Sequence, residues 1–90
     1  MQVQHIVNLG EGHSIEFGQA TWNSEAMSIR NRYTTSNGGF SPHSSSELPI
    51  EDVSLIVLET LRRDLFSIAE TMDIAQGALE SIRRRLTDTE

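Results

Sequence analysis

The residues that could do chemistry in this chain are its arginines, because every basic side chain in the sequence is an arginine. Arg30 and Arg32 alternate within a stretch that has the pattern of a β-strand, so both project from one face. A guanidinium is a planar fork that matches the oxygens of phosphates and carboxylates. A general bias of the chain toward arginine gives the same composition, so an anion site and a compositional origin are both open.

A hydroxyl-rich segment supplies a second part for such a site. Ser44 and Ser45 shortly precede a predicted helix start, and helix N-termini bind phosphates through oriented N–H groups. We therefore predict an anion pocket that includes Arg30, Arg32, Ser44 and Ser45. The alternative is a solvated loop, which is favoured by acidic residues in the same place: Glu47, Glu51 and Asp52.

Three further residues are candidates for the same ligand site. Phe40 offers a ring on which a base could stack, although a packing role is the simpler explanation. Arg62 and Arg63 lie on the predicted helix, and Arg62 could reach a partner protomer from there. The alternative for both is an ordinary surface ion pair with Glu59, three and four residues earlier.

The sequence does not favour enzyme chemistry. His5, His13 and His43 are scattered and lack the spacing of metal ligands, and the chain has no cysteine. Motifs of a nucleophile elbow or a phosphate-binding glycine loop are also missing. We expect no catalytic residue, no metal and no cofactor.

Composition narrows the partners and the location. A net charge of −6 argues against general nucleic-acid binding, which depends on neutralising phosphates. The sequence contains no apolar run of the roughly 18 residues that a membrane span needs. The start Met1-Gln2-Val3-Gln4 lacks the charge of a signal peptide. We expect a cytosolic protein of 90 residues that forms one domain and does not enter a membrane.

Residues 1–34 predict a small antiparallel β-meander of three strands. Val3, His5, Val7 and Leu9 share one face of the first strand, and Gly10-Glu11-Gly12 reads as a tight connection. Apolar and polar residues alternate again in the next two strands, with Gly18 marking a bulge or bend. Arg30 and Arg32 are expected on the solvated face.

Residues 35–49 are expected to form a Ser/Gly-rich loop, and residues 50–88 a helical region. Apolar residues in that region recur at alternating spacings of three and four, and we call this set the heptad seam: Leu58, Leu61, Leu65, Ile68, Met72, Ala75, Leu79, Ile82 and Leu86. The seam keeps its phase throughout, which favours one long helix. A helical hairpin with a corner near Met72 is the alternative, because Asp73 and Gln76 resemble a capping box.

The heptad seam predicts assembly, since one helix cannot bury such a stripe against itself. We expect a homo-oligomer formed through the seam. The expected fold class is therefore α+β, with an N-terminal antiparallel β-meander followed by a long C-terminal helix or helical hairpin.

The stretch from Asn37 to Asp52, Asn-Gly-Gly-Phe-Ser-Pro-His-Ser-Ser-Ser-Glu-Leu-Pro-Ile-Glu-Asp, resembles sequences of phage anti-defence proteins, in particular the anti-Thoeris sponge family. Members of that family have an N-terminal antiparallel sheet and C-terminal helices, and they assemble as dimers or larger oligomers. They sequester a cyclic ADP-ribose isomer without degrading it, and some also hold cyclic oligonucleotides. The resemblance implies a non-catalytic ligand sponge with pockets between protomers.

A protein-interaction module is the competing class. A small acidic oligomer that blocks a host protein would need the seam and the acidic surface, but no small-molecule ligand. Titration with cyclic ADP-ribose isomers and cyclic oligonucleotides distinguishes the two classes.

Overall fold

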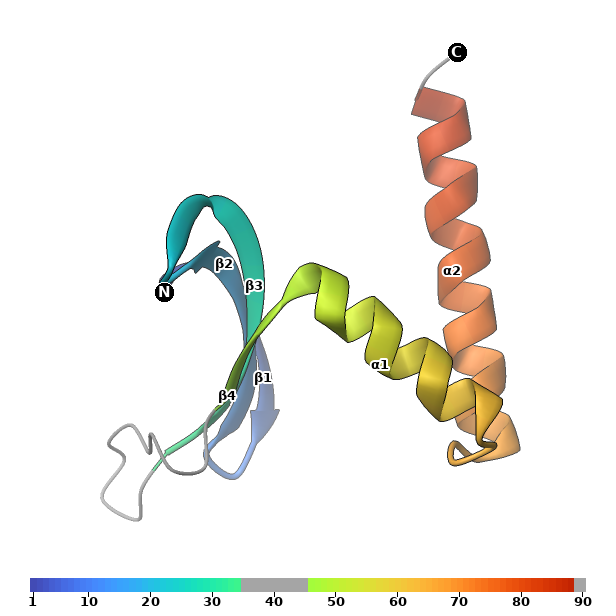
Figure 1. Cartoon of the computed structure of the whole chain (residues 1–90). Coiled ribbons are helices and arrows are strands. Elements are labelled where there is room, and N and C mark those ends of the chain that lie inside the picture. Colours follow the sequence, from blue (N-terminus) through green and yellow to red (C-terminus); the bar gives the residue numbers. More distant parts are fainter. Residues whose placement is uncertain (35–45, 89–90) are drawn as a thin grey trace. The chain divides into compact units, whose positions relative to one another are not determined.

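The computed structural model describes residues 1–34 and 46–88 of the 90-residue chain (Figure 1). The chain divides into two compact units, residues 1–55 and residues 56–90. The first unit holds the β-sheet and the start of helix α1. The second unit holds the rest of α1 and helix α2. This layout confirms the α+β class.

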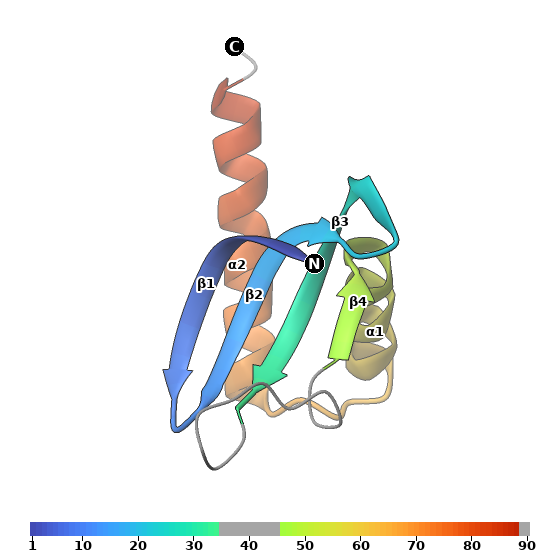
Figure 2. The same ribbon diagram turned by 90° about the vertical axis from the view of Figure 1, so that its left-hand side faces the viewer.

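The sheet is a four-stranded antiparallel meander in the order β1-β2-β3-β4 (Figure 2). Its strands are β1 (Gln2–Gly10), β2 (His13–Ala20), β3 (Asn23–Tyr33) and β4 (Ser46–Pro49). The three strands predicted within residues 1–34 are confirmed. The fourth strand was missed, because β4 lies inside the expected loop of residues 35–49 and is only four residues long. It pairs with β3 along one edge of the sheet.

The connection between β1 and β2 is the predicted tight turn. Gly10, Glu11 and Gly12 all have positive φ, at 87°, 53° and 77°. Glycine adopts this region without steric cost, which explains why two of the three positions are glycine. The Thr34 backbone N–H donates to the Gly12 carbonyl oxygen at 2.8 Å, which ties the end of β3 to the turn.

A bulge in β1 changes which face its first residues occupy. Val3 lies opposite Gly18, whereas His5 lies opposite Phe17, so Gln4 is an extra residue in the ladder. Successive residues of a strand point to opposite faces, and Val3 and His5 therefore lie on different faces. The expectation that they share a face was wrong for this reason.

Gly18 is required by the close approach of β1 at this bulge. A Cβ atom on Gly18 would lie 2.0 Å from the Gln2 carbonyl oxygen and 2.9 Å from the Val3 Cα atom. Both contacts are to backbone, which cannot move aside without disrupting the strand pair. The bend that the sequence indicated near Gly18 therefore depends on the absence of a side chain.

The buried face of the sheet is its polar face. Glu16 and Ser28 are buried, and both lie on the face that the alternation assigned to solvent; Ala20 is buried as well. Phe17 and Ile29, on the apolar face, are only half-buried. The expectation of a solvated polar face was therefore wrong.

Rolling of the sheet explains this burial. In Figure 2 the start of β1 curves across β2 and β3, and the N-terminus lies in front of the sheet. The Met1 amino-terminal nitrogen donates to Thr21 Oγ1 at 2.7 Å, and Thr21 Oγ1 donates to Glu47 Oε1 at 3.0 Å. The same nitrogen lies 3.9 Å from Glu47 Oε1. These contacts join the start of β1, the β2–β3 turn and β4 over the polar face.

The helical region contains two helices, α1 (Ile50–Arg62) and α2 (Ile68–Asp88). The preference for one unbroken helix was wrong, and the break lies at residues 63–67 rather than near Met72. Asp64 has a positive φ of 54°, which ends the helical path after α1. The heptad seam predicted an unbroken helix because the spacing of its apolar residues continues through this turn.

Ser67 and Glu70 form the capping box that starts α2. The Ser67 N–H donates to Glu70 Oε1 at 2.9 Å, and the Glu70 N–H donates to Ser67 Oγ at 3.1 Å. This reciprocal pair satisfies two N–H groups that the helix start would otherwise leave open. The box expected at Asp73 and Gln76 does not form there, since Gln76 lies inside α2 and donates to Glu80.

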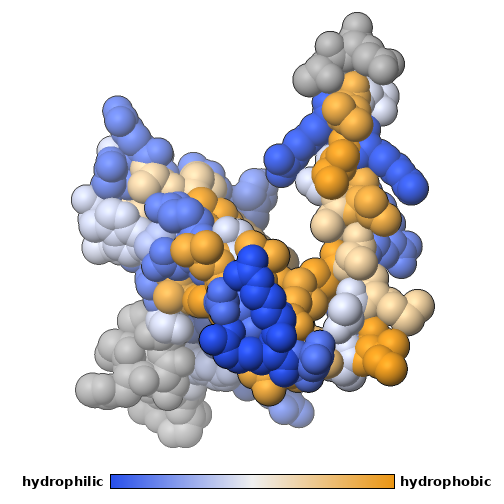
Figure 3. Space-filling model, turned by 45° about the vertical axis from the view of Figure 1, so that its right-hand side comes forward, coloured by the Kyte–Doolittle hydropathy of each residue, from blue (hydrophilic) through white to orange (hydrophobic). Residues whose placement is uncertain are grey.

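Few apolar side chains are covered in the described part of the chain. Within residues 1–34 and 46–87, Ala20 is the only apolar residue that is buried over the whole residue. Figure 3 shows apolar side chains exposed along α2. The large exposed members of the heptad seam are Leu58, Leu65, Ile68, Met72, Leu79, Ile82 and Leu86.

Gly18→Ala should destabilise the sheet, because the added methyl group overlaps the backbone of β1. We expect a loss of about 2 kcal/mol or more in the free energy of unfolding, measured by urea titration. Gly77→Ala is the matched control, since a Cβ at Gly77 meets nothing within 4 Å. Alanine should stabilise the helix there by up to about 1 kcal/mol. Equal effects of the two substitutions would contradict the close approach at Gly18.

Ser67→Ala should lower the stability of α2 by about 1 kcal/mol, because it removes one half of the capping box.

Hydrogen bonds from the Ser67 backbone N–H and hydroxyl hold the pKa of Glu70 below its ordinary value of 4.5. A carboxylate with a lowered pKa stabilises the fold above its unfolded pKa, and this stabilisation is lost as pH falls through the folded pKa. The difference in thermal midpoint between the wild type and Glu70→Gln should therefore be present at neutral pH. It should shrink as the pH falls through the lowered pKa of Glu70. A difference that stays constant with pH would count against the box.

Candidate anion-binding site

Two arginines and a glutamate meet on the polar face of the sheet. Glu16 on β2 lies directly opposite Arg30 on β3, and Arg32 is two residues further along β3 on the same face. Arg30 Nε donates to Glu16 Oε1 at 2.7 Å, and Arg30 Nη2 lies 2.7 Å from the same oxygen. Arg32 Nη1 lies 3.6 Å from Glu16 Oε2. Each carboxylate oxygen therefore faces its own arginine, and we call these three residues the arginine cluster.

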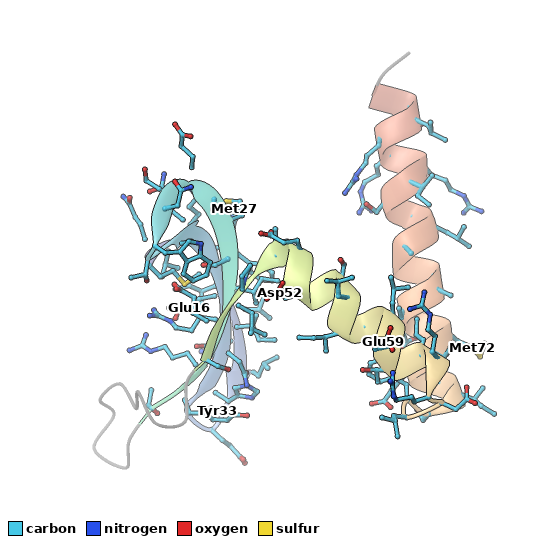
Figure 4. The ribbon with its side chains drawn as sticks, viewed as in Figure 1. Glu16, Met27, Tyr33, Asp52, Glu59 and Met72 are labelled. Carbon is cyan, nitrogen blue, oxygen red and sulfur yellow. The ribbon has the colours of Figure 1, made fainter. Side chains whose placement is uncertain are left out.

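The arginine cluster is partly withdrawn from water. The Glu16 side chain is 3% exposed, whereas those of Arg30 and Arg32 are 20% and 33% exposed. A covered carboxylate needs a partner, since ion pairs strengthen as solvent is excluded and an isolated charge is costly there. Two guanidinium groups face the Glu16 carboxylate, and Glu47 on β4 is the cross-strand neighbour of Arg30, so two arginines and two glutamates share this face. Figure 4 labels Glu16 on the sheet.

A hollow of about 310 Å³ lies at the β1–β2 end of the same face. Asn8 and Ser14 are opposite each other in the β1–β2 register, and both share the face of Glu16. Ser14 is also the cross-strand neighbour of Arg32, so the hollow begins one strand away from the arginine cluster. Its lining includes hydroxyl, amide and carboxylate groups together with one aliphatic side chain: Ile6, Asn8, Gly10, Glu11, Gly12, His13, Ser14 and Thr34.

The structure brings together only part of the predicted site. Arg30 and Arg32 lie side by side as expected. Phe40, Ser44 and Ser45 lie outside the described residues. Glu16, Asn8 and Ser14 were not among the predicted site residues, although the alternation already assigned Ser14 and Glu16 to the polar face with the arginines.

Arg62 and Arg63 belong to the second compact unit. Arg62 Nη1 donates to Glu59 Oε1 at 2.7 Å, and Arg63 Nη1 donates to Glu59 Oε2. Hydrogen bonds from Arg63 and Arg62 hold the pKa of Glu59 below its ordinary value. The surface ion pairs that the spacing suggested are thus present. Figure 4 labels Glu59 on α1.

His13 and Tyr33 form a pair on the other face of the sheet. Their rings stack with centroids 4.3 Å apart and planes 6° from parallel. The ring of His13 also hydrogen-bonds to the Asn31 side chain. His13 therefore packs against its cross-strand neighbours, which is a structural role.

Comparison with known proteins identifies no relative: no family model, no curated protein and no solved structure matches this chain. None of the helices in residues 1–34 and 46–88 is long and apolar enough to cross a membrane.

Glu16→Gln should destabilise the sheet, because it leaves Arg30 partly buried without its carboxylate. We expect a loss of about 3 kcal/mol in the free energy of unfolding, measured by urea titration. Glu59→Gln is the matched control, since it also removes ion pairs to two arginines, at an exposed site. Exposed ion pairs contribute little to stability, so the urea midpoint of Glu59→Gln should be close to that of the wild type. Equal effects of the two variants would mean that the arginine cluster does not stabilise the sheet.

Proposed function

We propose that this chain is a non-catalytic, cytosolic protein that binds and sequesters a phosphate-bearing, nucleotide-type signal. Candidate ligands are a cyclic ADP-ribose isomer or a cyclic oligonucleotide, as in the anti-defence sponge family that the sequence resembles. The observation that carries the proposal is the pair Arg30 and Arg32 beside a polar hollow on one face of the sheet.

Preorganisation of the arginines supports anion binding. Glu16 holds Arg30 at two points and lies beside Arg32, and all three side chains arise from paired strands. Arginine side chains lose much conformational freedom on binding, and a prior contact reduces that loss. A phosphate at this face would meet guanidinium groups that are already held in position.

The size of the hollow supports a site that a second protomer completes. Its volume of about 310 Å³ is at the lower end of the range of about 300–1,000 Å³ for small-molecule pockets. One nucleotide half of a ligand fits such a space, with its phosphate toward Arg32. The exposed apolar surface of the chain provides the means to bring a second copy to the site.

Arg32→Ala should weaken ligand binding by about ten- to a hundredfold, since a hydrogen bond to a charged group contributes roughly 1.5–3 kcal/mol. Isothermal titration with a panel of cyclic ADP-ribose isomers and cyclic di- and trinucleotides measures this. Arg84→Ala, on the exposed side of α2, is the control and should bind like the wild type. Arg62→Ala and Phe40→Ala test whether those residues contribute to the same site.

Recovery of the ligand distinguishes sequestration from turnover. A sponge returns its ligand intact after heat denaturation, and chromatography of the released ligand checks this. Binding that is equal in the wild type and in Arg32→Ala would place the ligand away from the arginine cluster.

An acidic protein-interaction module is the second candidate. The observation that favours it is the exposure of large apolar side chains in both compact units, including Trp22 in the β2–β3 turn and Ile68 on α2. Exposed apolar surface of this kind marks sites of protein contact. The titration decides between the candidates, because an interaction module binds none of the ligand panel.

A further inference from the structure

Helix α2 carries a stripe of exposed apolar residues along one face. The part of the heptad seam on this helix consists of Ile68, Met72, Ala75, Leu79, Ile82 and Leu86. Ile68 is 82% exposed and Met72 is 65% exposed, and the remaining large members are more than half exposed. A stripe of this kind requires a covering surface, because apolar area left in water costs about 25 cal/mol per Å².

The stripe is symmetric about position 77. Ile68 and Leu86 lie nine residues to either side of Gly77, Met72 and Ile82 lie five, and Ala75 and Leu79 lie two. In a twofold dimer, residue i contacts residue j of the partner, and residue j contacts residue i. Two copies of α2 that run in opposite directions and cross at position 77 would therefore form a continuous series of apolar pairs.

The charges of α2 are divided between its two ends. Glu70 and Asp73 lie in the first turns, where there is no basic residue, and all three arginines of the helix, Arg83, Arg84 and Arg85, lie near the end between Glu80 and Asp88. Antiparallel pairing places the arginines of one copy alongside the acidic residues of the other. Parallel pairing would instead gather both sets of three arginines at one end, where like charges repel.

The side chains that flank the stripe are also complementary in size. Ala69 and Thr71 flank the stripe at its start, and Arg83 and Arg85 flank it near its end. In antiparallel pairing each long arginine passes over a small residue, so its apolar stem covers the seam while its charged end reaches toward the acidic residues. Helix dipoles are also favourably placed when neighbouring helices are antiparallel.

We infer that α2 pairs with α2 of a second copy in an antiparallel arrangement centred on position 77. This inference rests on the assembly that the proposed function requires, and it adds the direction and register of the pairing. Met72 of one copy then faces Ile82 of the other. The two copies of one residue are separated along the dimer axis, and this separation increases with the number of positions between that residue and residue 77.

Cysteine crosslinking tests the direction, and the natural chain has no cysteine to interfere. The variants are Met72→Cys and Ile82→Cys, each oxidised alone and as a mixture in the full chain. In the antiparallel dimer the two copies of position 82 are separated by about 15 Å along the axis, because each lies five residues from the centre. A disulfide requires Cα atoms within about 7 Å, so only the mixture should form a covalent dimer.

Each outcome has a definite meaning. Crosslinking of the mixture alone, at least tenfold above either single variant, supports the antiparallel pairing. Self-crosslinking of each single variant shows parallel helices and overturns the inference. An oligomer that forms no crosslink overturns the inference but leaves the proposed assembly intact, whereas a wild type that sediments as a monomer overturns both. If either variant loses helix in circular dichroism, Thr71→Cys and Arg85→Cys give the same test beside the stripe.

Discussion

Large apolar side chains that are exposed in the described residues of one copy are the main physical constraint on this chain. The 90 residues form two compact units, and small units have little interior in which to place side chains. In the described residues the buried positions are mostly polar, and large aliphatic side chains on α1, α2 and the sheet remain exposed. The proposed function and the proposed pairing of α2 both supply a second surface that would cover these side chains.

The polar interior of the rolled sheet explains how a site could arise on so small a scaffold. Glu16 holds Arg30 and Arg32 within the sheet, where a larger protein would place apolar packing. The same contacts stabilise the strand register and hold positive charge beside the hollow. Structural support and the proposed anion recognition therefore involve the same residues.

The sequence predicts the parts of this fold that local pattern controls. Alternation gave the first three strands and assigned Arg30 and Arg32 to one face, and the glycines around Glu11 gave the turn. Strand β4 was missed because Ser46–Pro49 has no strand pattern of its own and is defined by pairing with β3.

Two further predictions were wrong: the unbroken helix and the solvated polar face of the sheet. The Ser67–Glu70 capping box is visible in the sequence, but the heptad seam kept its phase through residues 63–67 and favoured an unbroken helix. The burial of Glu16 depends on the roll of the sheet and the bulge at Gln4, which involve residues distant in sequence. The sequence near Glu16 therefore gives no local pattern from which this burial could be predicted.

The dependence of thermal stability on protein concentration tests the central claim most directly. If assembly covers the exposed apolar surface, mass action requires the unfolding midpoint to rise with concentration. We expect a clear rise over a hundredfold range, together with a sedimentation mass at least twice the 10.1 kDa of one chain. A midpoint that is independent of concentration, with a mass of 10.1 kDa throughout, would show that a single copy is stable with its apolar surface in water and would contradict the account.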